Sequence, residues 1–276
     1  MLLITGCNGQ LGRCLADLLT DAICTDVKTL DITNADEVNK FVKDNNIDLI
    51  INCAAYTAVD MAQSDSLNAK KINVDGPKNL AQTGAKIIHI STDYVFDGCG
   101  HLPYTPDMQT NPLSVYGQTK REGEIAVAEN SDNYVIIRTA WLYSEYGNNF
   151  VKTMRRLGTE RDSINVVSDQ IGTPTFARNL ADAIVKIIPQ MTPEKSGIYH
   201  YTNMGVCSWY DFASEIMEMS GINCNVNPIK SEQYPTPAPR PFYSVLDKTK
   251  IIDTFGIEIP HWKNGLKQCI DELNKN

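Results

Sequence analysis

Short apolar runs alternate with amphipathic stretches through the first half of the chain. Runs rich in Ile, Val and Leu, bounded by polar or turn-forming residues, predict buried strands of a parallel sheet. Stretches with apolar residues every three or four positions predict helices between them, with Asn34 as one N-cap and Gly76-Pro77 as a weak point. The expected strands are residues 1–5, 22–26, 48–53, 86–90 and 133–139, and the expected helices are residues 11–19, 35–44 and 66–83.

Strands that alternate with helices predict an α/β fold with a Rossmann-type, doubly wound parallel sheet covered by helices on both faces. Ligands of such sheets gather at the carboxyl ends of the strands. After about Tyr143, glycine, proline and polar residues interrupt the pattern, apart from a helix expected over 179–188. We therefore expect a smaller C-terminal lobe, with an extended proline-rich segment over 234–241.

The first expected strand is followed by a glycine loop with the pattern G-x-x-G-x-x-G. Glycines permit a tight turn and let backbone N–H groups at a helix N-terminus approach a pyrophosphate. The loop comprises Gly6, Gly9, Gln10, Leu11 and Gly12. Its position between a strand and a helix predicts an NAD(P)-binding Rossmann domain over residues 1–150. We expect the chain to return to that domain near 176–203, and residues 151–276 to form mainly a substrate-binding lobe.

The ends of the next two strands are expected to line the same dinucleotide. Asp26 ends the second strand, where a carboxylate accepts hydrogen bonds from the adenosine ribose and favours NAD(H). Lys28 is close enough in sequence to meet the 2′-phosphate of NADP(H) instead, so the sequence leaves the two cofactors open, and Asp26 also fits a plain turn. The other expected cofactor contacts are Asp31, Ile32, Ala54, Ala55 and Tyr56.

A phenol and an ammonium stand four positions apart at Tyr116 and Lys120. On a helix these positions share one face. The ammonium is expected to lower the pKa of Tyr116 from about 10, so that the phenol exchanges a proton near neutral pH. Thr92 follows an apolar run, and we expect its hydroxyl, rather than that of Ser91, to bind a carbonyl oxygen. With the glycine loop, this set predicts hydride transfer at an alcohol or ketone carbon, with Lys120 also holding the nicotinamide ribose.

Composition narrows the class of protein. The chain has 276 residues, 42% hydrophobic content and a net charge of −8, which argues against a nucleic-acid or anionic-membrane partner. No cationic leader and no membrane-length apolar run is present in the sequence, so we expect a soluble, cytoplasmic protein. The eight cysteines show no C-x-x-C spacing and the four histidines are scattered. They predict reduced thiols and no dedicated metal site.

The motifs together resemble the extended short-chain dehydrogenase/reductase superfamily and, within it, the dTDP-4-dehydrorhamnose reductase family. The most specific segments are S-T-D-Y-V-F-D-G from Ser91 and Y-P-T-P-A from Tyr234. Others lie at 9–12, 30–33, 54–60, 116–120, 138–141, 147–150 and 169–175, so the resemblance covers nearly the whole chain.

The resemblance implies NAD(P)H-dependent reduction of the C4 ketone of dTDP-4-dehydro-L-rhamnose, with Tyr116 as proton donor. It implies that Thr92, Asp93 and Trp141 meet the deoxysugar, and Arg240 is expected to pair with the substrate diphosphate. The sequence alone also allows a core tryptophan and a solvated arginine at the last two positions. Some family members carry Mg²⁺ at a homodimer contact, but no acidic cluster here predicts such a site.

Two other functions fit parts of the pattern. The non-catalytic regulatory subunit of methionine adenosyltransferase shares this fold and many of the motifs, but the complete set of Thr92, Tyr116 and Lys120 favours the enzyme. A sugar-nucleotide epimerase needs room for the sugar to turn, which a sequence does not reveal. Related dehydratases carry Glu after the active-site Asp, whereas Tyr94 follows Asp93 here. This difference disfavours water elimination.

Overall fold

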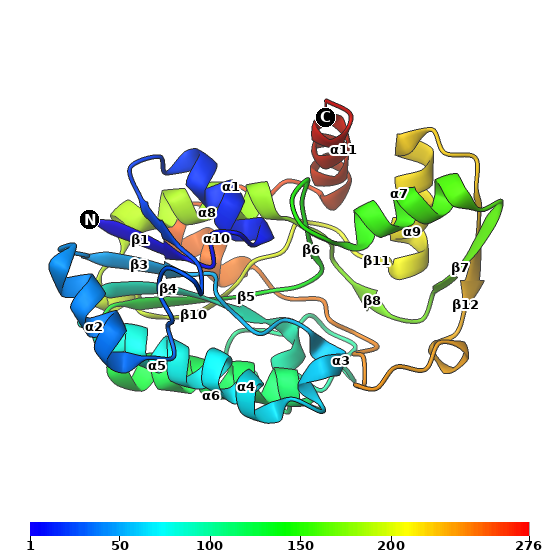
Figure 1. Ribbon diagram of the computed structural model, residues 1–276. Coiled ribbons are helices and arrows are strands. Elements are labelled where there is room, and N and C mark those ends of the chain that lie inside the picture. Colours follow the sequence, from blue (N-terminus) through cyan, green and yellow to red (C-terminus); the bar gives the residue numbers. More distant parts are fainter. Residues whose placement is uncertain (276) are drawn as a thin grey trace.

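A six-stranded parallel sheet forms the centre of the molecule, in a computed structural model that describes residues 1–275 (Figure 1). The strand order is β10-β5-β4-β3-β1-β2, and every neighbouring pair is parallel. The strands are β1 (Leu2–Thr5), β2 (Ile23–Thr25), β3 (Leu49–Asn52), β4 (Lys86–Thr92), β5 (Tyr134–Thr139) and β10 (Gly197–His200). The predicted α/β class with a Rossmann-type sheet is confirmed.

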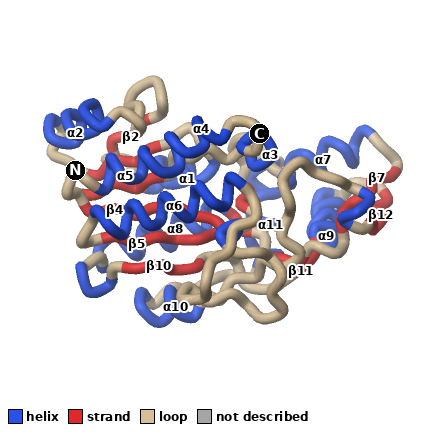
Figure 2. The backbone as a smooth tube through the Cα atoms, turned by 90° about the horizontal axis from the view of Figure 1, so that it is seen from below, coloured by secondary structure: helices blue, strands red, loops and turns tan. Residues whose placement is uncertain are grey.

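Helices cover both faces of this sheet (Figures 1 and 2). One layer contains α1 (Gln10–Leu18), α8 (Ala177–Ile187) and α10 (Thr249–Phe255), and the other contains α2 (Ala35–Asp44), α5 (Gly76–Ala81) and α6 (Val115–Asn130). Successive strand residues point to opposite faces, so Ile4 packs in the first layer and Leu3 in the second. Burial on both faces explains why the strands are continuous apolar runs rather than alternating ones.

A second group of elements packs around its own apolar cluster, which includes Phe212 and Trp262. It contains α7 (Phe150–Glu160), α9 (Trp209–Ser220), α11 (Trp262–Leu273) and the paired strands β7 (Ser163–Val167) and β12 (Asn225–Ile229). Smaller elements are β6 (Leu142–Tyr143), β8 (Ile171–Gly172), β9 (Thr175–Phe176), β11 (Cys207–Ser208), α3 (Val59–Ala62) and α4 (Ser66–Lys70). The division of the chain at residue 150 stays a prediction.

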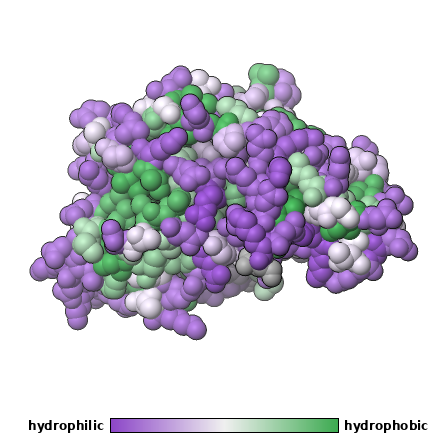
Figure 3. Space-filling model, turned by 90° about the horizontal axis from the view of Figure 1, so that it is seen from above, coloured by the Kyte–Doolittle hydropathy of each residue, from purple (hydrophilic) through white to green (hydrophobic). Residues whose placement is uncertain are grey.

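Hydrophilic residues cover most of the face seen from above the sheet (Figure 3). Apolar residues on that face gather at the left, over the part of the molecule that contains the central sheet. Among residues 1–275, no helix has both the length and the apolar content needed to cross a bilayer.

The helix expected over 66–83 is interrupted. After α4 the chain forms a π-helical turn, Lys71–Asp75, before α5 begins at Gly76. Pro77 has no N–H and cannot continue the regular hydrogen-bond ladder, which explains the break at this place. The turn buries Asn73, whose amide donates to the Thr119 hydroxyl of α6 at 3.1 Å. The π-helical turn is therefore joined to α6 by a buried hydrogen bond.

A buried carboxylate fixes α6 against the sheet. Glu124 of α6 is fully buried, and Arg138 of β5 binds both of its oxygens, with Nε–Oε1 at 2.8 Å and Nη2–Oε2 at 2.7 Å. The hydroxyl of Ser91 on β4 donates to the same carboxylate at 2.6 Å. One charged hydrogen-bond cluster thus joins α6, β4 and β5. It fixes the position of α6 along the direction of the strands.

The Glu124→Gln variant should lose at least about 3 kcal/mol of unfolding free energy, because the buried Arg138 guanidinium would keep its charge without a counterion. Urea denaturation followed by circular dichroism measures this loss. Glu160→Gln is the matched control, since Glu160 pairs with Arg156 in an exposed i,i+4 bridge and should change stability by less than about 0.5 kcal/mol. If both substitutions changed the unfolding free energy by the same small amount, Glu124 would not be the essential counterion of Arg138.

Candidate active site

A cavity of about 830 Å³ opens at the carboxyl ends of the strands. It lies where the strand order reverses, because the chain runs from β1 outward to β2 on one side and then continues with β3 and β4 on the other. Doubly wound sheets bind their ligands at this switch point. The walls come from the glycine loop, from the segments that follow β2, β3 and β4, from α6 and from residues 139–148.

The glycine loop fits a pyrophosphate. Gly6 has φ +67°, and a Cβ there would lie 2.7 Å from the Ala54 backbone nitrogen. A Cβ on Gly12 would lie 2.3 Å from the Gly6 carbonyl oxygen. Gly9 precedes the first turn of α1, and no side chain caps that helix end. Its first N–H groups are therefore left for an anionic ligand at the positive end of the helix.

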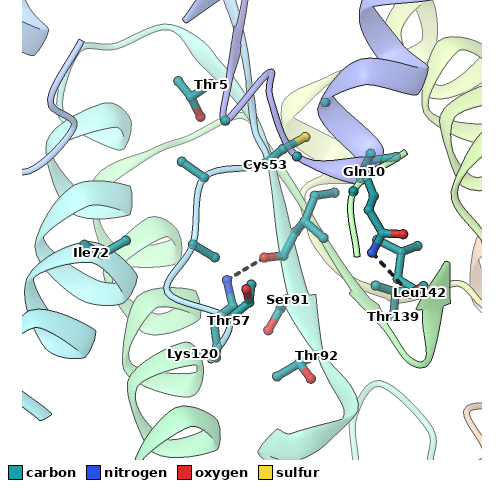
Figure 4. A pocket seen from close by; sticks show the side chains of 18 of the residues that line it. Thr5, Gln10, Cys53, Thr57, Ile72, Ser91, Thr92, Lys120, Thr139 and Leu142 are labelled. Carbon is teal, nitrogen blue, oxygen red and sulfur yellow. Dashed lines mark hydrogen bonds between the residues drawn. The ribbon is translucent and has the colours of Figure 1, made fainter. Parts of the chain in front are cut away.

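Gln10 connects the glycine loop to the opposite wall of the cavity (Figure 4). Its amide donates to the Leu142 carbonyl oxygen at 3.4 Å, and its Oε1 accepts from Asn149 Nδ2 at 2.9 Å. The predicted loop residues Gly6, Gly9, Gln10, Leu11 and Gly12 all line the cavity.

The adenosine side is lined as expected, except at Tyr56. Asp26, Asp31, Ile32, Ala54 and Ala55 border the cavity. Asp26 accepts from the side-chain amide of Asn8 and from the Lys28 N–H, the latter at 2.9 Å, whereas the Lys28 side chain is not part of the lining.

Tyr56 does not border the cavity. Its hydroxyl donates to Asp65 at 3.1 Å and its N–H donates to Asn73 at 2.8 Å. These two groups thus have partners within the chain, and the expected cofactor contact of Tyr56 stays a prediction.

Thr92, Tyr116 and Lys120 all line this cavity. Thr92 ends β4, and Lys120 reaches the same space from α6 (Figure 4). Tyr116 stands in the first turn of α6, which Ser114 caps by accepting from the Gly117 N–H. The expected helical spacing therefore places the phenol and the ammonium toward one cavity.

The expected lowering of the Tyr116 pKa is not found in the ligand-free protein. Burial raises the pKa of Tyr116 to about 12, with a smaller contribution from Asp93, while the Thr92 hydroxyl acts in the opposite direction. Burial also lowers the pKa of Lys120 to about 8 against the raising effects of Glu124 and Cys53. Poor solvation of the phenolate in the cavity outweighs the attraction that the sequence predicted.

Asp93 presents an unpaired oxygen in the cavity wall. Its Oδ1 accepts from the Thr92 hydroxyl at 3.0 Å, whereas its buried Oδ2 has no hydrogen-bond partner among the described residues. Burial raises the pKa of this carboxyl to about 7. Trp141 lines the cavity with φ +49°, and its ring stacks on Trp209 at a centroid distance of 3.5 Å. One face of the Trp141 ring is therefore already covered.

Arg240 does not border the cavity. Its Nη2 lies 2.6 Å from Asp60 Oδ2, and its Nη1 donates to the Ala238 carbonyl oxygen at 3.2 Å. Asp60 therefore supplies an anionic partner to Arg240 in the ligand-free protein, and the expected pairing of Arg240 with a diphosphate stays a prediction.

A buried chain of polar side chains behind Lys120 was not predicted from the sequence. Lys120 Nζ lies 3.4 Å from His89 Nε2, and His89 Nδ1 lies 3.0 Å from the Asn52 amide. Thr5 donates to Asn52 Oδ1 at 2.7 Å. A lone histidine inside the apolar run at 86–90 was the available signal. Among residues 1–275, no group of three or more His, Cys, Asp or Glu side chains is arranged to hold a metal ion.

Comparisons with known proteins agree over the whole chain. The family model of the RmlD substrate binding domain matches residues 1–275. The dTDP-4-dehydrorhamnose reductase of Aggregatibacter actinomycetemcomitans is 43% identical over 285 residues, covering 96% of this chain and 97% of the relative.

Two solved structures are closely similar. A dTDP-4-dehydrorhamnose reductase from Clostridium acetobutylicum has 48% identity and a TM-score of 0.95 over 99% of both chains. The Bacillus anthracis enzyme of that name, in complex with NADP, has 42% identity and a TM-score of 0.94 over 98% of both chains. The resemblance found in the motifs is confirmed, and the chain belongs to the dTDP-4-dehydrorhamnose reductase family, whose sequence model is the RmlD substrate binding domain.

Proposed function

We propose that this chain reduces the C4 ketone of dTDP-4-dehydro-L-rhamnose to dTDP-L-rhamnose with NADPH or NADH. The observation that carries the proposal is the shared cavity: Thr92, Tyr116 and the glycine loop border one space. The names of the curated relatives support an NAD(P)-dependent oxidoreductase, and one solved relative holds NADP. The relatives give no support to a non-catalytic regulatory subunit of methionine adenosyltransferase.

The glycine loop and its neighbours fit a nicotinamide dinucleotide, which supplies the hydride when bound. The uncapped start of α1 would hold the pyrophosphate, and Asp26 would accept from the adenosine ribose hydroxyls. Asp31, Ile32, Ala54 and Ala55 would border the adenosine half, and Lys120 would hold the nicotinamide ribose. Gly6 packs so closely on the Ala54 backbone that no side chain fits there, which keeps the turn of the glycine loop open for the pyrophosphate.

Tyr116 supplies the proton. With a pKa of about 12 it is protonated at neutral pH, so its O–H can donate to the substrate carbonyl oxygen and transfer the proton as that oxygen becomes negative. The Thr92 hydroxyl, which donates to Asp93 in the ligand-free protein, would turn its single proton to the same substrate oxygen and orient it by a second hydrogen bond. Lys120 in its ammonium form then stabilises the phenolate that remains on Tyr116.

Asp93 and Trp141 would contact the deoxysugar. The unpaired Oδ2 of Asp93 offers a partner for a sugar hydroxyl, and the Trp141 ring in the cavity wall offers an apolar surface. Arg240 would contribute to diphosphate binding only if the substrate replaced Asp60 as its ionic partner.

Tyr116→Phe should reduce kcat by about 10²- to 10⁴-fold, because it removes the proton donor and leaves the ring in place. The assay follows the loss of 340 nm absorbance with NADPH and enzymatically prepared dTDP-4-dehydro-L-rhamnose, and fluorescence titration with NADPH checks that cofactor binding is retained. Tyr210→Phe, in α9 outside the cavity lining, is the matched control and should keep full activity. Normal turnover by Tyr116→Phe would remove the phenol from the mechanism, and no turnover by the wild type would refute the proposed function.

Asp26→Asn should raise the ratio of kcat/KM for NADPH to that for NADH by about tenfold, equivalent to about 1.4 kcal/mol, because it removes a negative charge facing the 2′-phosphate. Lys28→Met tests the alternative that the Lys28 ammonium binds the 2′-phosphate of NADP(H). Since the Lys28 side chain lies outside the cavity lining, its loss should leave the ratio unchanged. A ratio that responds to Lys28 and not to Asp26 would reverse the assignment.

A further inference from the structure

His89 is a buried titratable residue that the proposed mechanism does not use. It lies on β4 in the middle of the sheet, has no exposed surface and does not line the cavity. Its ring nonetheless approaches the site from behind, with Nε2 at 3.4 Å from Lys120 Nζ. Lys120 Nζ also donates a hydrogen bond to the Ile90 carbonyl oxygen at 2.6 Å.

The neighbouring amide determines which ring nitrogen of His89 accepts. Asn52 Oδ1 accepts from the Ala54 backbone N–H at 3.2 Å and from the Thr5 hydroxyl at 2.7 Å. A backbone N–H can only donate, so the oxygen of the amide must face Ala54 and its nitrogen must face His89. Asn52 Nδ2 therefore donates to His89 Nδ1 across 3.0 Å, and Nδ1 carries a lone pair.

The proton of His89 must then lie on the nitrogen that faces the lysine. Burial and the charge of Lys120 hold the pKa of His89 well below its usual range, so the imidazole is neutral. A neutral imidazole has one N–H, and with Nδ1 accepting, that N–H is on Nε2. It points at Lys120 Nζ. An ammonium has no lone pair to accept this bond, whereas a neutral amine has one.

We propose that His89 is a positioning residue that acts through Lys120: it turns an N–H toward Nζ, which favours the neutral amine and leaves the lysine to donate to Ile90. This inference rests on the proposed function for its kinetic consequence. Two other titratable groups act on Lys120 in the opposite direction, Glu124 one turn later on α6 and Cys53 after β3, and Tyr116 lies one turn earlier. Burial lowers the pKa of Lys120 to about 8 against these two groups, and the N–H of His89 would act in the same direction as burial.

The first test is the tautomer of His89 in the ligand-free wild type. Protein labelled with ¹⁵N-histidine is examined by NMR, which distinguishes a protonated ring nitrogen from an unprotonated one, and His89→Gln identifies the signals. The expected result is a neutral ring with its proton on Nε2. A proton on Nδ1 would overturn the proposal. This measurement requires neither enzymatic activity nor that the His89→Leu variant folds.

The second test compares two substitutions. In His89→Gln the amide oxygen can accept from Asn52 and the amide nitrogen can donate to Lys120, so the pattern of the imidazole is kept. His89→Leu removes both groups. The pKa of Lys120 is read in ligand-free protein from ¹³Cε-labelled lysine, with Lys120→Met to assign the signal. It should rise by at least about half a unit in the leucine variant and stay near the wild-type value in the glutamine variant.

The pH profile of kcat/KM gives the functional readout. The ammonium form of Lys120 stabilises the phenolate, so activity should fall above the pKa of Lys120, and this basic limb should move to higher pH in His89→Leu but not in His89→Gln. If neither the basic limb of the pH profile nor the pKa of Lys120 changed in His89→Leu, the inference would be overturned. If the NMR results are as expected and no variant, wild type included, turns the dTDP-sugar over, the proposed function fails and the His89–Lys120 contact stands.

Discussion

The geometry of the site depends on one buried carboxylate. Glu124 joins α6 to β4 and β5 through Ser91 and the two-point contact of Arg138. Tyr116 and Lys120 precede Glu124 on the same helix, and Thr92 follows Ser91 on the same strand. A shift of the helix along the strand would separate these groups. Buried ion pairs add little net stability compared with apolar packing, but they define one arrangement among close alternatives.

Burial also sets the chemistry of the site. The same exclusion of water raises the pKa of Tyr116 and Asp93 and lowers that of Lys120, so each group is moved toward its neutral form. A neutral phenol is what a proton donor requires. A cavity of this kind also strengthens each hydrogen bond that a substrate oxygen makes within it. The packing that forms the core and the proton affinities at the site therefore have a common origin.

The features that the sequence predicted well are local ones. The strands, the glycine loop and the i,i+4 pair of Tyr116 and Lys120 depend on neighbouring residues, and the structure contains them. The features that the sequence did not reveal concern partners distant in sequence: Arg240 pairs with Asp60, Tyr56 donates to Asp65, and burial rather than Lys120 dominates the pKa of Tyr116. Side-chain direction and desolvation depend on the assembled fold, so no local pattern reveals them.

In the proposed reaction a tyrosine hydroxyl and a threonine hydroxyl meet at one substrate oxygen, and the reactive edge of a nicotinamide lies beside the carbon that carries this oxygen. The most direct measurement is a crystal structure of the protein with NADP⁺ and dTDP-L-rhamnose. The account predicts the sugar O4 within hydrogen-bonding distance of both Tyr116 Oη and Thr92 Oγ1, with the nicotinamide beside the C4 atom. A sugar whose O4 is turned away from both hydroxyls, with the nicotinamide elsewhere in the cavity, would contradict it.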